Sequence, residues 1–306
     1  MIDMKINNCA IIGMGALGLL YASKIAENIG QDAVSFVVDE GRFSRYKGRH
    51  FVINDKPVSF NIVCEKDAKP YDLVIVAVKY PSLKGALDTM QNCIGENTTI
   101  ISVMNGVTSE KIIGARFGDE KLLYAIAQGM DAMHFGDSLK YTSYGQVLIG
   151  TDDPQKAERL NALDDFLSRA DIPHEIPADI LHALWGKFLL NVGVNQVCMV
   201  YNTNYGGVLA EGEPNRMMIA AMREVIAVAA SQGVTLTEKD LNFYVGLERV
   251  LPPESMPSMA QDRLERRPCE VDMFAGTVTE LAKEHDILVP ANAYLLKRAK
   301  EIEAEY

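Results

Sequence analysis

The stretch that decides the fold is Cys9-Ala10-Ile11-Ile12-Gly13-Met14-Gly15-Ala16-Leu17-Gly18, near the N-terminus. A short apolar run leads into the glycines, and an apolar helical pattern follows them. Gly13 would permit a tight turn, Gly15 would let backbone approach a pyrophosphate, and Gly18 would let helix and strand pack closely. The helix N-terminus would offer free amides and partial positive charge to phosphates. We therefore expect a dinucleotide site on residues 13–18; the alternative is a glycine-rich turn of another α/β protein.

Outward from this turn, the first half of the chain alternates short apolar runs with helical patterns. Residues 146–150 predict a late edge strand, and the other runs, which are rich in β-branched residues, span 34–38, 73–78 and 99–103. Such runs suit strands buried on both faces of a parallel sheet, with helices expected at 81–93 and 107–117. Residues 51–53 and 60–63 flank a polar turn and predict a hairpin. The pattern predicts a doubly wound α/β domain of the Rossmann type.

The second half of the chain has a different character. Pro173 and Pro177 punctuate a polar stretch, and strand-like runs nearly vanish after it. The remaining patterns are helical, at about 178–205, 213–232, 237–247, 258–266, 270–285 and 290–305. We therefore expect a dinucleotide-binding domain over residues 1–177 and an all-helical domain over residues 178–306.

The composition of the chain limits which classes of partner it can bind and indicates its cellular compartment. The 306 residues carry a formal net charge of −11, which disfavours nucleic acid and anionic membranes as partners. No signal peptide and no membrane-spanning run of 18 or more apolar residues is expected. The five cysteines have irregular spacing and lie beside apolar residues. They predict buried free thiols without a metal site, in a reducing cytoplasm.

The acidic residue that follows the second expected strand bears on which dinucleotide binds. Asp39 lies where a carboxylate can bind the ribose hydroxyls of NAD and repel the 2′-phosphate of NADP. However, Arg42 and Arg45 follow within two turns and could reach a phosphate. The residues therefore leave the choice between NAD and NADP open.

Two polar residues follow the next two strong strands. Lys79 and Asn105 lie at or just beyond the carboxyl ends of these strands, and in a doubly wound sheet such ends face the ligand crevice. Both are candidates for contacting cofactor or substrate. The alternative is a loop lysine and an ordinary Asn-Gly turn.

A polar row crosses an apolar helical segment of the second half. Lys187, Asn191 and Asn195 are spaced i, i+4, i+8, so they share one helix face. A lysine on a buried helix is costly unless it is paired or used. One cation and two amides suit a small anionic substrate that bears a carbonyl group. The alternatives are a row facing water and a structural polar network.

A second polar cluster includes Ser258 and Glu270. Glu270 follows Pro268 and is expected in the first turn of a helix. Spacing alone favours an ordinary acidic residue that complements the helix dipole.

Taken together, these motifs resemble the ketopantoate reductase (2-dehydropantoate 2-reductase) family over nearly the whole chain. The resemblance rests on the residues 13–18 turn and on Val78-Lys79, Asn105-Gly106, Leu184-Trp185-Gly186-Lys187 with Asn191 and Asn195, Ser258-Met259-Ala260-Gln261-Asp262, and Glu270-Val271-Asp272. It implies a Rossmann-type domain followed by a helical domain, with the active site in the cleft. Members that use NADPH usually carry an arginine where this chain has Asp39. NADP is therefore the family default, with NAD as the alternative.

The resemblance also implies roles for single residues. Lys187 matches the catalytic lysine, which polarises the ketone and supplies a proton, and Glu270 matches the glutamate that binds substrate and sets the state of the lysine. Asn105 matches an asparagine between nicotinamide and substrate, and Lys79 matches a lysine on the nicotinamide side. Asn191, Asn195 and Ser258 match substrate-binding groups.

The implied activity is the NAD(P)H-dependent reduction of 2-dehydropantoate to pantoate, as in pantothenate biosynthesis. Two alternatives stand beside it: a reductase of another branched 2-oxo acid, and a dinucleotide-sensing protein without catalysis. The apolar residues of the helices after residue 213 fit either a homodimer interface or a core.

Overall fold

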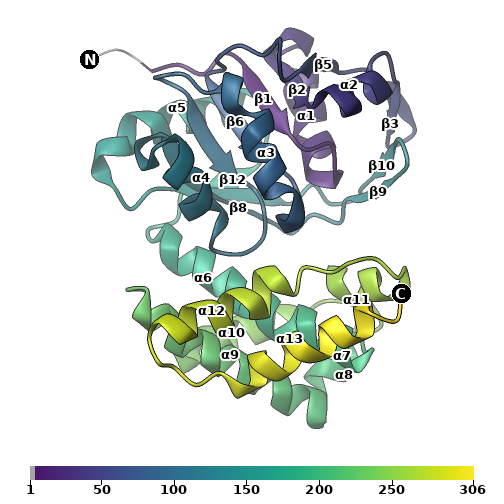
Figure 1. Ribbon diagram of the computed structural model, residues 1–306, viewed down its shortest axis with the longest axis vertical. Coiled ribbons are helices and arrows are strands. Elements are labelled where there is room, and N and C mark those ends of the chain that lie inside the picture. The colour runs from purple at the N-terminus through teal and green to yellow at the C-terminus, as the bar shows by residue number, and fades with distance from the viewer. Residues whose placement is uncertain (1–3) are drawn as a thin grey trace. The chain divides into compact units, whose positions relative to one another are not determined.

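The computed structural model describes residues 4–306, which divide into two compact units (Figure 1). The first unit comprises residues up to Asn105 together with Ser109–Ile180. The second comprises Gly106–Thr108 and Leu181–Tyr306. The packing thus divides the chain after Ile180, where sequence patterning had placed the division after residue 177.

The first unit is built on an eight-stranded sheet in which six neighbouring strands, counted inward from one edge, are all parallel. They lie in the order β5-β2-β1-β6-β7-β8. Their bounds are β1 Cys9–Ile12, β2 Val34–Val38, β5 Asn61–Cys64, β6 Leu73–Val76, β7 Thr99–Ser102 and β8 Leu122–Gln128. Counted along the chain this order is 3-2-1-4-5-6, which confirms the predicted Rossmann-type fold. The sheet continues beyond β8 through β11 (Gln146–Gly150), which is antiparallel to β8, and β12 (His174–Glu175).

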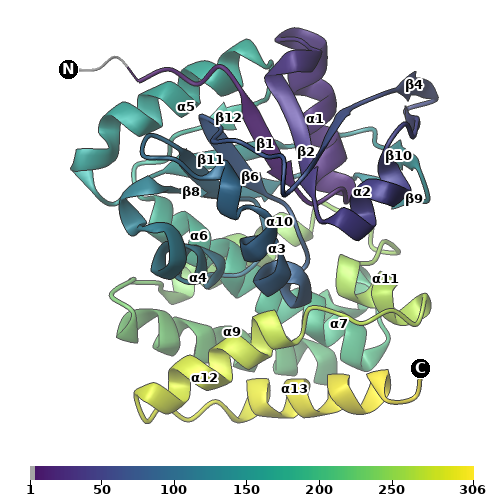
Figure 2. The same cartoon turned by 45° about the horizontal axis from the view of Figure 1, so that its top comes forward.

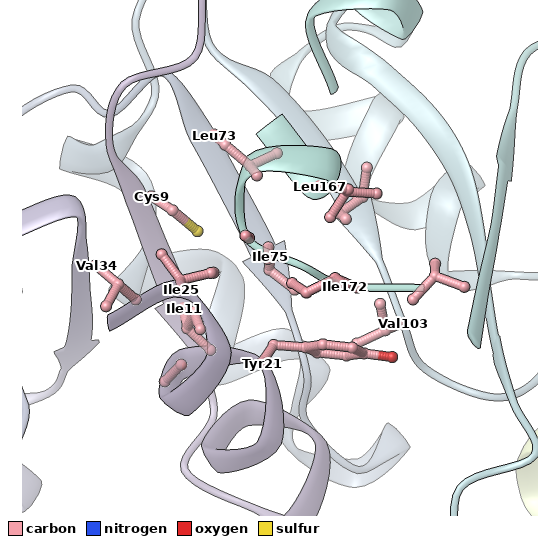
Figure 3. Packing of buried hydrophobic residues seen from close by; sticks show 14 of the residues in the cluster. Cys9, Ile11, Tyr21, Ile25, Val34, Leu73, Ile75, Val103, Leu167 and Ile172 are labelled. Atoms are coloured by element: carbon pink, nitrogen blue, oxygen red, sulfur yellow. The ribbon is translucent and has the colours of Figure 1, made fainter. Parts of the chain in front are cut away.

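Helices cover both faces of this sheet. α1 (Ala16–Asn28) and α5 (Ala157–Arg169) contribute to the hydrophobic core of one face, and α3 (Leu83–Thr89) and α4 (Ser109–Phe117) to that of the other. Figure 3 shows Tyr21 and Ile25 of α1 and Leu167 of α5 against Leu73 and Ile75 of β6. The remaining helical elements are α2 (Glu40–Tyr46) and the short 3₁₀ turns η1 (Gln31–Ala33), η2 (Tyr80–Ser82), η3 (Gln91–Cys93), η4 (Asp119–Lys121) and η5 (Pro154–Lys156).

The predicted hairpin between 51–53 and 60–63 is wrong. β3 (Phe51–Ile53) turns back at Asn54 and Asp55, whose φ angles of 46° and 66° form a two-residue turn, and pairs with β4 (Lys56–Val58). Residues 61–64 instead join the main sheet beside β2. β3 also pairs with β10 (Ser138–Lys140), and β9 (Met133–Phe135) completes a second, four-stranded sheet.

The second unit is helical in the part of the chain that the structure describes. The helices are α6 Ile180–Leu190, α7 Gln196–Tyr201, α8 Tyr205–Leu209, α9 Glu213–Ser231, α10 Glu238–Glu248, α11 Ser258–Leu264, α12 Thr277–Glu284 and α13 Pro290–Glu303. α9, which packs against α7, α12 and α13 (Figure 2), buries one of its faces in this unit. Within it, Met218, Ala221, Met222 and Val225 are fully buried.

Two of the predicted helices are interrupted. The expected helix over 178–205 is interrupted by the π-helical turn η6 (Asn191–Asn195). Its last part, α7, ends before Asn202, whose backbone adopts a left-handed conformation. The expected helix over 270–285 begins with a second π-helical turn, η7 (Asp272–Gly276). In such a turn each backbone hydrogen bond reaches back five residues in place of four. Polar and apolar spacing alone does not reveal this widening.

Candidate active site

The glycine-rich turn joins β1 to α1 in a conformation that requires glycine at two positions. Gly13 has a φ of 115°, and a Cβ there would lie 2.3 Å from the carbonyl oxygen of Ala77. A Cβ at Gly18 would lie 2.0 Å from the carbonyl oxygen of Gly13. Side chains at either position would push β1, α1 and the segment after β6 apart. The two glycines therefore have the tight-turn and close-packing roles expected from the sequence.

The same turn leaves room where a pyrophosphate would approach. A Cβ placed on Gly15 would meet no atom within 4 Å. Gly15 is the N-cap of α1, no side chain caps the helix there, and the first turn of α1 contains no acidic residue. The backbone amides are thus open to an anion, while Met14, Ala16 and Leu17 pack against the core. The residues of this turn fit the diphosphate of a dinucleotide.

Asp39 follows β2 and is the N-cap of α2. Its Oδ1 accepts a hydrogen bond from the backbone N–H of Arg42 at 2.7 Å, and its Oδ2 forms an ion pair with the Arg42 guanidinium. Although partial burial opposes the effect, these bonds to Arg42 lower the pKa of Asp39. Asp39 is therefore an ionised carboxylate beside the dinucleotide turn, and it also stabilises the start of a helix.

Lys79 and Asn105 follow β6 and β7 at the same sheet edge. β2, β1, β6 and β7 are consecutive parallel strands, so the residues after their carboxyl ends share one edge. This edge includes the switch point between β1 and β6, where ligands bind in open α/β sheets. Lys79 is exposed and Asn105 is half-buried. The structure thus brings Gly13–Gly18, Asp39, Lys79 and Asn105 to one edge of the sheet.

A buried polar cluster next to Asn105 was not expected from the sequence. The Ser102 hydroxyl hydrogen-bonds that of Ser109 at 2.9 Å, and Ser109 donates to the Glu110 carboxylate at 2.9 Å. Burial raises the pKa of Glu110 to about 7. These bonds tie the end of β7 to the start of α4, on either side of the segment that contains Asn105. An isolated Ser-Glu pair at a helix start gives no signal of this burial.

In the second unit, Lys187 lies on α6, four residues before Asn191, the first residue of the π-helical turn η6. The side chain is half-buried, and burial of the ammonium lowers the pKa of Lys187 to about 8, against the opposing charge of Glu270. α6 meets the η7 segment through the rings of Phe188 and Phe274, whose centroids lie 6.3 Å apart. The structure therefore brings together two ionisable residues that are far apart in the sequence.

Glu270 precedes the helix in which it was expected. The first helical residue is Asp272, and the carbonyl of Glu270 accepts hydrogen bonds from the N–H groups of Met273 and Phe274. Its side chain is half-buried and acts on the charge of Lys187. The interpretation of Glu270 as an ordinary dipole-complementing residue does not account for this electrostatic coupling.

Asn191 and Asn195 begin and end η6. Asn195 donates from Nδ2 to Oδ1 of Asn191 at 3.3 Å. The Nδ2 of Asn191 is buried and has no hydrogen-bond partner among residues 4–306. A buried donor without a partner costs free energy, and it is the feature expected where a ligand supplies the missing acceptor.

Ser258 is the first residue of α11 and is exposed. α11 packs against α7, and Arg263 of α11 donates to the carbonyl oxygens of Met199 and Val200 at the end of α7. The helix that carries Ser258 is thus fixed to the helix that follows Asn195.

Other kinds of site find little support in the part of the chain that the structure describes. Residues 4–306 contain no group of three or more His, Cys, Asp or Glu side chains that could hold a metal ion. None of their helices is long and apolar enough to cross a membrane. Cys9, Cys64, Cys93 and Cys198 are buried free thiols as expected, and Cys269 is half-buried.

Known proteins resemble this chain over almost its full length. A 2-dehydropantoate 2-reductase of Aquifex aeolicus is 26% identical over 310 residues, covering 95% of this chain and 96% of the relative. One of Streptococcus pyogenes serotype M1 is 22% identical over 285 residues, covering 92% of each. Among solved structures, D-mandelate dehydrogenase in complex with NADH has a TM-score of 0.86 at 20% identity, covering 97% of this chain and 99% of that one. The dimeric ketopantoate reductase of Staphylococcus aureus has a TM-score of 0.81 at 19% identity, with the same coverage.

Two family models match consecutive parts of the chain. The model described as Ketopantoate reductase PanE/ApbA matches residues 9–153, which include the glycine-rich turn, Asp39, Lys79 and Asn105. The model described as Ketopantoate reductase PanE/ApbA C terminal matches residues 179–303, which include Lys187 and Glu270. With both halves matched in order, the chain belongs to the ketopantoate reductase family of oxidoreductases.

Proposed function

We propose that this protein is an NAD(P)H-dependent reductase of a 2-oxo acid, and that 2-dehydropantoate is its substrate. The observation that carries the proposal is the environment of Lys187, whose pKa is lowered to about 8 by burial while Glu270 acts on its charge. A catalytic acid works best when its pKa lies near the operating pH. A lysine with this pKa is protonated at neutral pH and can release its proton readily.

The proposed reaction converts a ketone into a secondary alcohol. Residues 13–18 would hold the dinucleotide, and the chemistry that it would supply is a hydride, with its two electrons, for the carbonyl carbon. Lys187 stabilises the negative charge that develops on the carbonyl oxygen and then donates the proton that completes the hydroxyl group. The products are a 2-hydroxy acid and the oxidised dinucleotide.

The remaining site residues divide between substrate and cofactor. The unpartnered Nδ2 of Asn191 is suited to donate to the substrate, with Asn195 holding its amide in place. Ser258 is assigned to substrate binding by its match to the family motif. Glu270 keeps the pKa of Lys187 from falling further and contributes to substrate binding. Asn105 and Lys79 are assigned to the nicotinamide side.

For the cofactor, we propose NADH. The ionised Asp39 follows β2, the position from which a carboxylate binds the ribose hydroxyls of NAD and repels a 2′-phosphate. Arg42 is paired with Asp39, so its charge is partly neutralised. The similar fold of D-mandelate dehydrogenase, described in complex with NADH, is consistent with this choice. NADPH, the default of the family, is the alternative.

Steady-state kinetics test the proposal directly. Purified protein is assayed with NADH and NADPH against 2-dehydropantoate, other branched 2-oxo acids and an aryl 2-oxo acid. Lys187→Ala should lower kcat by about 10²–10⁴-fold. Lys239→Ala, which removes an exposed lysine from α10, is the matched control and should leave kcat unchanged. If Lys187→Ala keeps most of its turnover, Lys187 is not the proton donor.

The same panel separates the alternatives. The likeness to D-mandelate dehydrogenase, described with anilino(oxo)acetate, makes a different 2-oxo acid the main competitor to 2-dehydropantoate. A higher kcat/KM with an aryl or other branched substrate would identify that competitor. Tight dinucleotide binding without reduction of any 2-oxo acid would instead indicate a sensor.

A further inference from the structure

Two π-helical turns lie next to the residues proposed to react. η6 begins at Asn191 and ends at Asn195, and η7 begins two residues after Glu270. The two turns pack against each other. π-helical turns are rare, and they occur often at functional sites because they change the direction of side chains on a helix.

The turn at η6 changes how the polar row is aligned. On a regular α-helix, residues spaced four apart drift around the axis by about 40° at each step. Over Lys187, Asn191 and Asn195 that drift would accumulate. A π-helical turn contains more residues than an α-helical turn, so each residue rotates through a smaller angle about the helix axis. The π-helical turn therefore counters the angular drift between Asn191 and Asn195. Gly193 inside the turn lets it approach α9, because a Cβ there would lie 2.4 Å from Cγ of Met222.

The side chain of Gln196 connects the two turns. Gln196 is fully buried, and its Nε2 donates to the carbonyl oxygen of Val192 inside η6 at 2.7 Å. Its Oε1 accepts from the backbone N–H of Ala275 inside η7 at 2.8 Å. One carboxamide thus bonds to the main chain of both turns, and each bond satisfies a buried backbone group. A buried backbone group left without its partner destabilises the folded state, because its hydrogen bonds to water are lost and not replaced.

A second layer fixes the orientation of this carboxamide. Nε2 of Gln196 also donates to Oδ1 of Asn292 at 3.3 Å. The amide of Asn292 donates to the carbonyl oxygen of Ala221 at 3.1 Å and to the carboxylate of Glu224 at 2.8 Å. Glu224 in turn accepts from the backbone N–H of Ala291 at 2.7 Å. Because Asn292 holds Gln196 from one side, the carboxamide keeps its donor toward η6 and its acceptor toward η7.

We propose that Gln196 is a positioning residue that sets the placement of the Asn191–Asn195 pair and of Glu270 relative to Lys187. The inference rests on the proposed function of those four residues. Gln196 acts only through the main chain of the two turns. Loss of its side chain frees η7 to move, which weakens the effect of the Glu270 charge on Lys187. Since that charge raises the pKa of Lys187, its withdrawal shifts the pKa of Lys187 downward.

The test compares Gln196→Leu with Gln196→Glu and with Asn215→Leu. Gln196→Leu removes both bonds to the main chain. Gln196→Glu has the same shape and keeps an acceptor for Ala275. Asn215→Leu is the matched control, because the Asn215 carboxamide also donates to a main-chain carbonyl, that of Val208 at 3.0 Å, but joins α9 to α8.

For Gln196→Leu we expect kcat to fall at least tenfold and the high-pH limb of kcat/KM to move to lower pH. The KM for the dinucleotide should be unchanged, because residues 13–18 belong to the other unit. In Gln196→Glu the fall in kcat should be smaller than in Gln196→Leu. If Gln196→Leu does not fold, the pH profile of Gln196→Glu tests the positioning role alone. Asn215→Leu should keep the wild-type profile. The proposal would be overturned if the high-pH limb of kcat/KM stayed at its wild-type position in both Gln196 variants. It would also be overturned if Asn215→Leu shifted that limb by the same amount.

A readout without turnover separates this inference from the proposed function. NMR titration of ¹³Cε-labelled lysine reports the pKa of Lys187 in the wild type and in each variant. If the wild type reduces no 2-oxo acid, the proposed function fails, yet a downward shift in the Gln196 variants alone still supports the positioning role. If the protein is active and the titration of Lys187 is the same in all variants, the positioning role fails while the proposed function stands.

Discussion

Asn195 donates a hydrogen bond to Asn191 across the π-helical turn, while the other end of the Asn191 amide is buried without a partner among residues 4–306. The carboxamide of Asn191 is therefore hydrogen-bonded at its oxygen and not at its nitrogen. Asn195 occupies the acceptor of Asn191 and leaves its donor open. The second unit thus holds in place a buried hydrogen-bond donor that is available to a ligand.

Replacing Asn191 should separate binding from stability. Asn191→Leu removes a buried donor that has no partner among residues 4–306, together with the acceptor of the long 3.3 Å hydrogen bond from Asn195. The relief of the unpaired donor offsets the loss of that bond, so the free energy of unfolding should change little. Loss of one hydrogen bond to an anionic substrate should lower kcat/KM by about 10- to 100-fold. Chemical denaturation and steady-state kinetics on the same preparation check both. A clear loss of stability with unchanged kcat/KM would instead assign Asn191 to the structural framework.

The pH dependence of the reaction should report Lys187. The reductive reaction needs the protonated lysine, so kcat/KM should be constant below the lysine pKa of about 8 and fall above it. Glu270 raises that pKa, and Glu270→Gln should therefore move the limb to lower pH. The pH profile of kcat/KM from pH 6 to 10 measures both. A limb that stays in place in Glu270→Gln would show that Glu270 does not set the state of the lysine.

Asp39 should determine the preference between NADH and NADPH. Asp39→Asn keeps an oxygen that can cap α2 but removes the negative charge, so it should favour NADPH. Repulsion of a phosphate at contact distance is about 1–4 kcal/mol, which corresponds to a change in preference of about fivefold or more. The ratio of kcat/KM values for the two cofactors measures the change.

Asp39→Ala serves as the comparison for the capping role of this residue. It also removes the cap of α2, so it should lose about 1 kcal/mol of stability in addition to the change in preference. Equal effects on NADH and NADPH in both variants would restrict Asp39 to helix capping.

Glu110 should make the stability depend on pH. Its pKa is about 7 in the folded protein against 4.5 for an ordinary glutamate, so the folded state binds its proton more tightly than the unfolded state. The resulting stabilisation is complete below about pH 4.5 and is lost as the pH rises through 7, by about 3 kcal/mol. Glu110→Gln does not titrate and should show a smaller decline between pH 5 and 8.

Urea denaturation at several pH values measures this decline. Glu120→Gln provides a control at an exposed carboxylate, whose pKa is lowered by its bond to Lys121. If Glu110→Gln declines as steeply as the wild type, other groups dominate the dependence. Glu248, which is buried and has a pKa of about 7, would be the next to replace.

The central strands of the sheet could be predicted because their apolar runs are continuous. β1, β2, β6 and β7 follow this rule, whereas β8 is a similar run, Leu122–Gln128, that was not recognised as a strand. The hairpin was misplaced because two apolar runs flank a polar turn on either side of Pro57. Pro57 belongs to the polar turn that the sequence predicts, but it lies in β4 at the edge of the small sheet.

The site was only partly predictable for the same kind of reason. Lys187, Asn191 and Asn195 are visible as a row because their spacing is local. The coupling of Lys187 to Glu270 depends on tertiary packing, so only the family resemblance pointed to it. The π-helical turns and the role of Gln196 left no local signal. A glutamine beside the polar row looks like one more member of that row until its partners in η7 and α13 are known.

The short segment Gly106–Thr108 has a consequence for the exchange of domains between relatives. It lies in the first half of the sequence but packs with the second unit, where Gly106 stands against Met273. A fragment of residues 181–306 would therefore lack residues 106–108, which pack with it in the second unit. A chimera that joins the helical half of one reductase to the nucleotide-binding half of another would bring together a Gly106 and a Met273 of different origin. Transplanting residues 106–108 together with the helical half should give the better-folded hybrid.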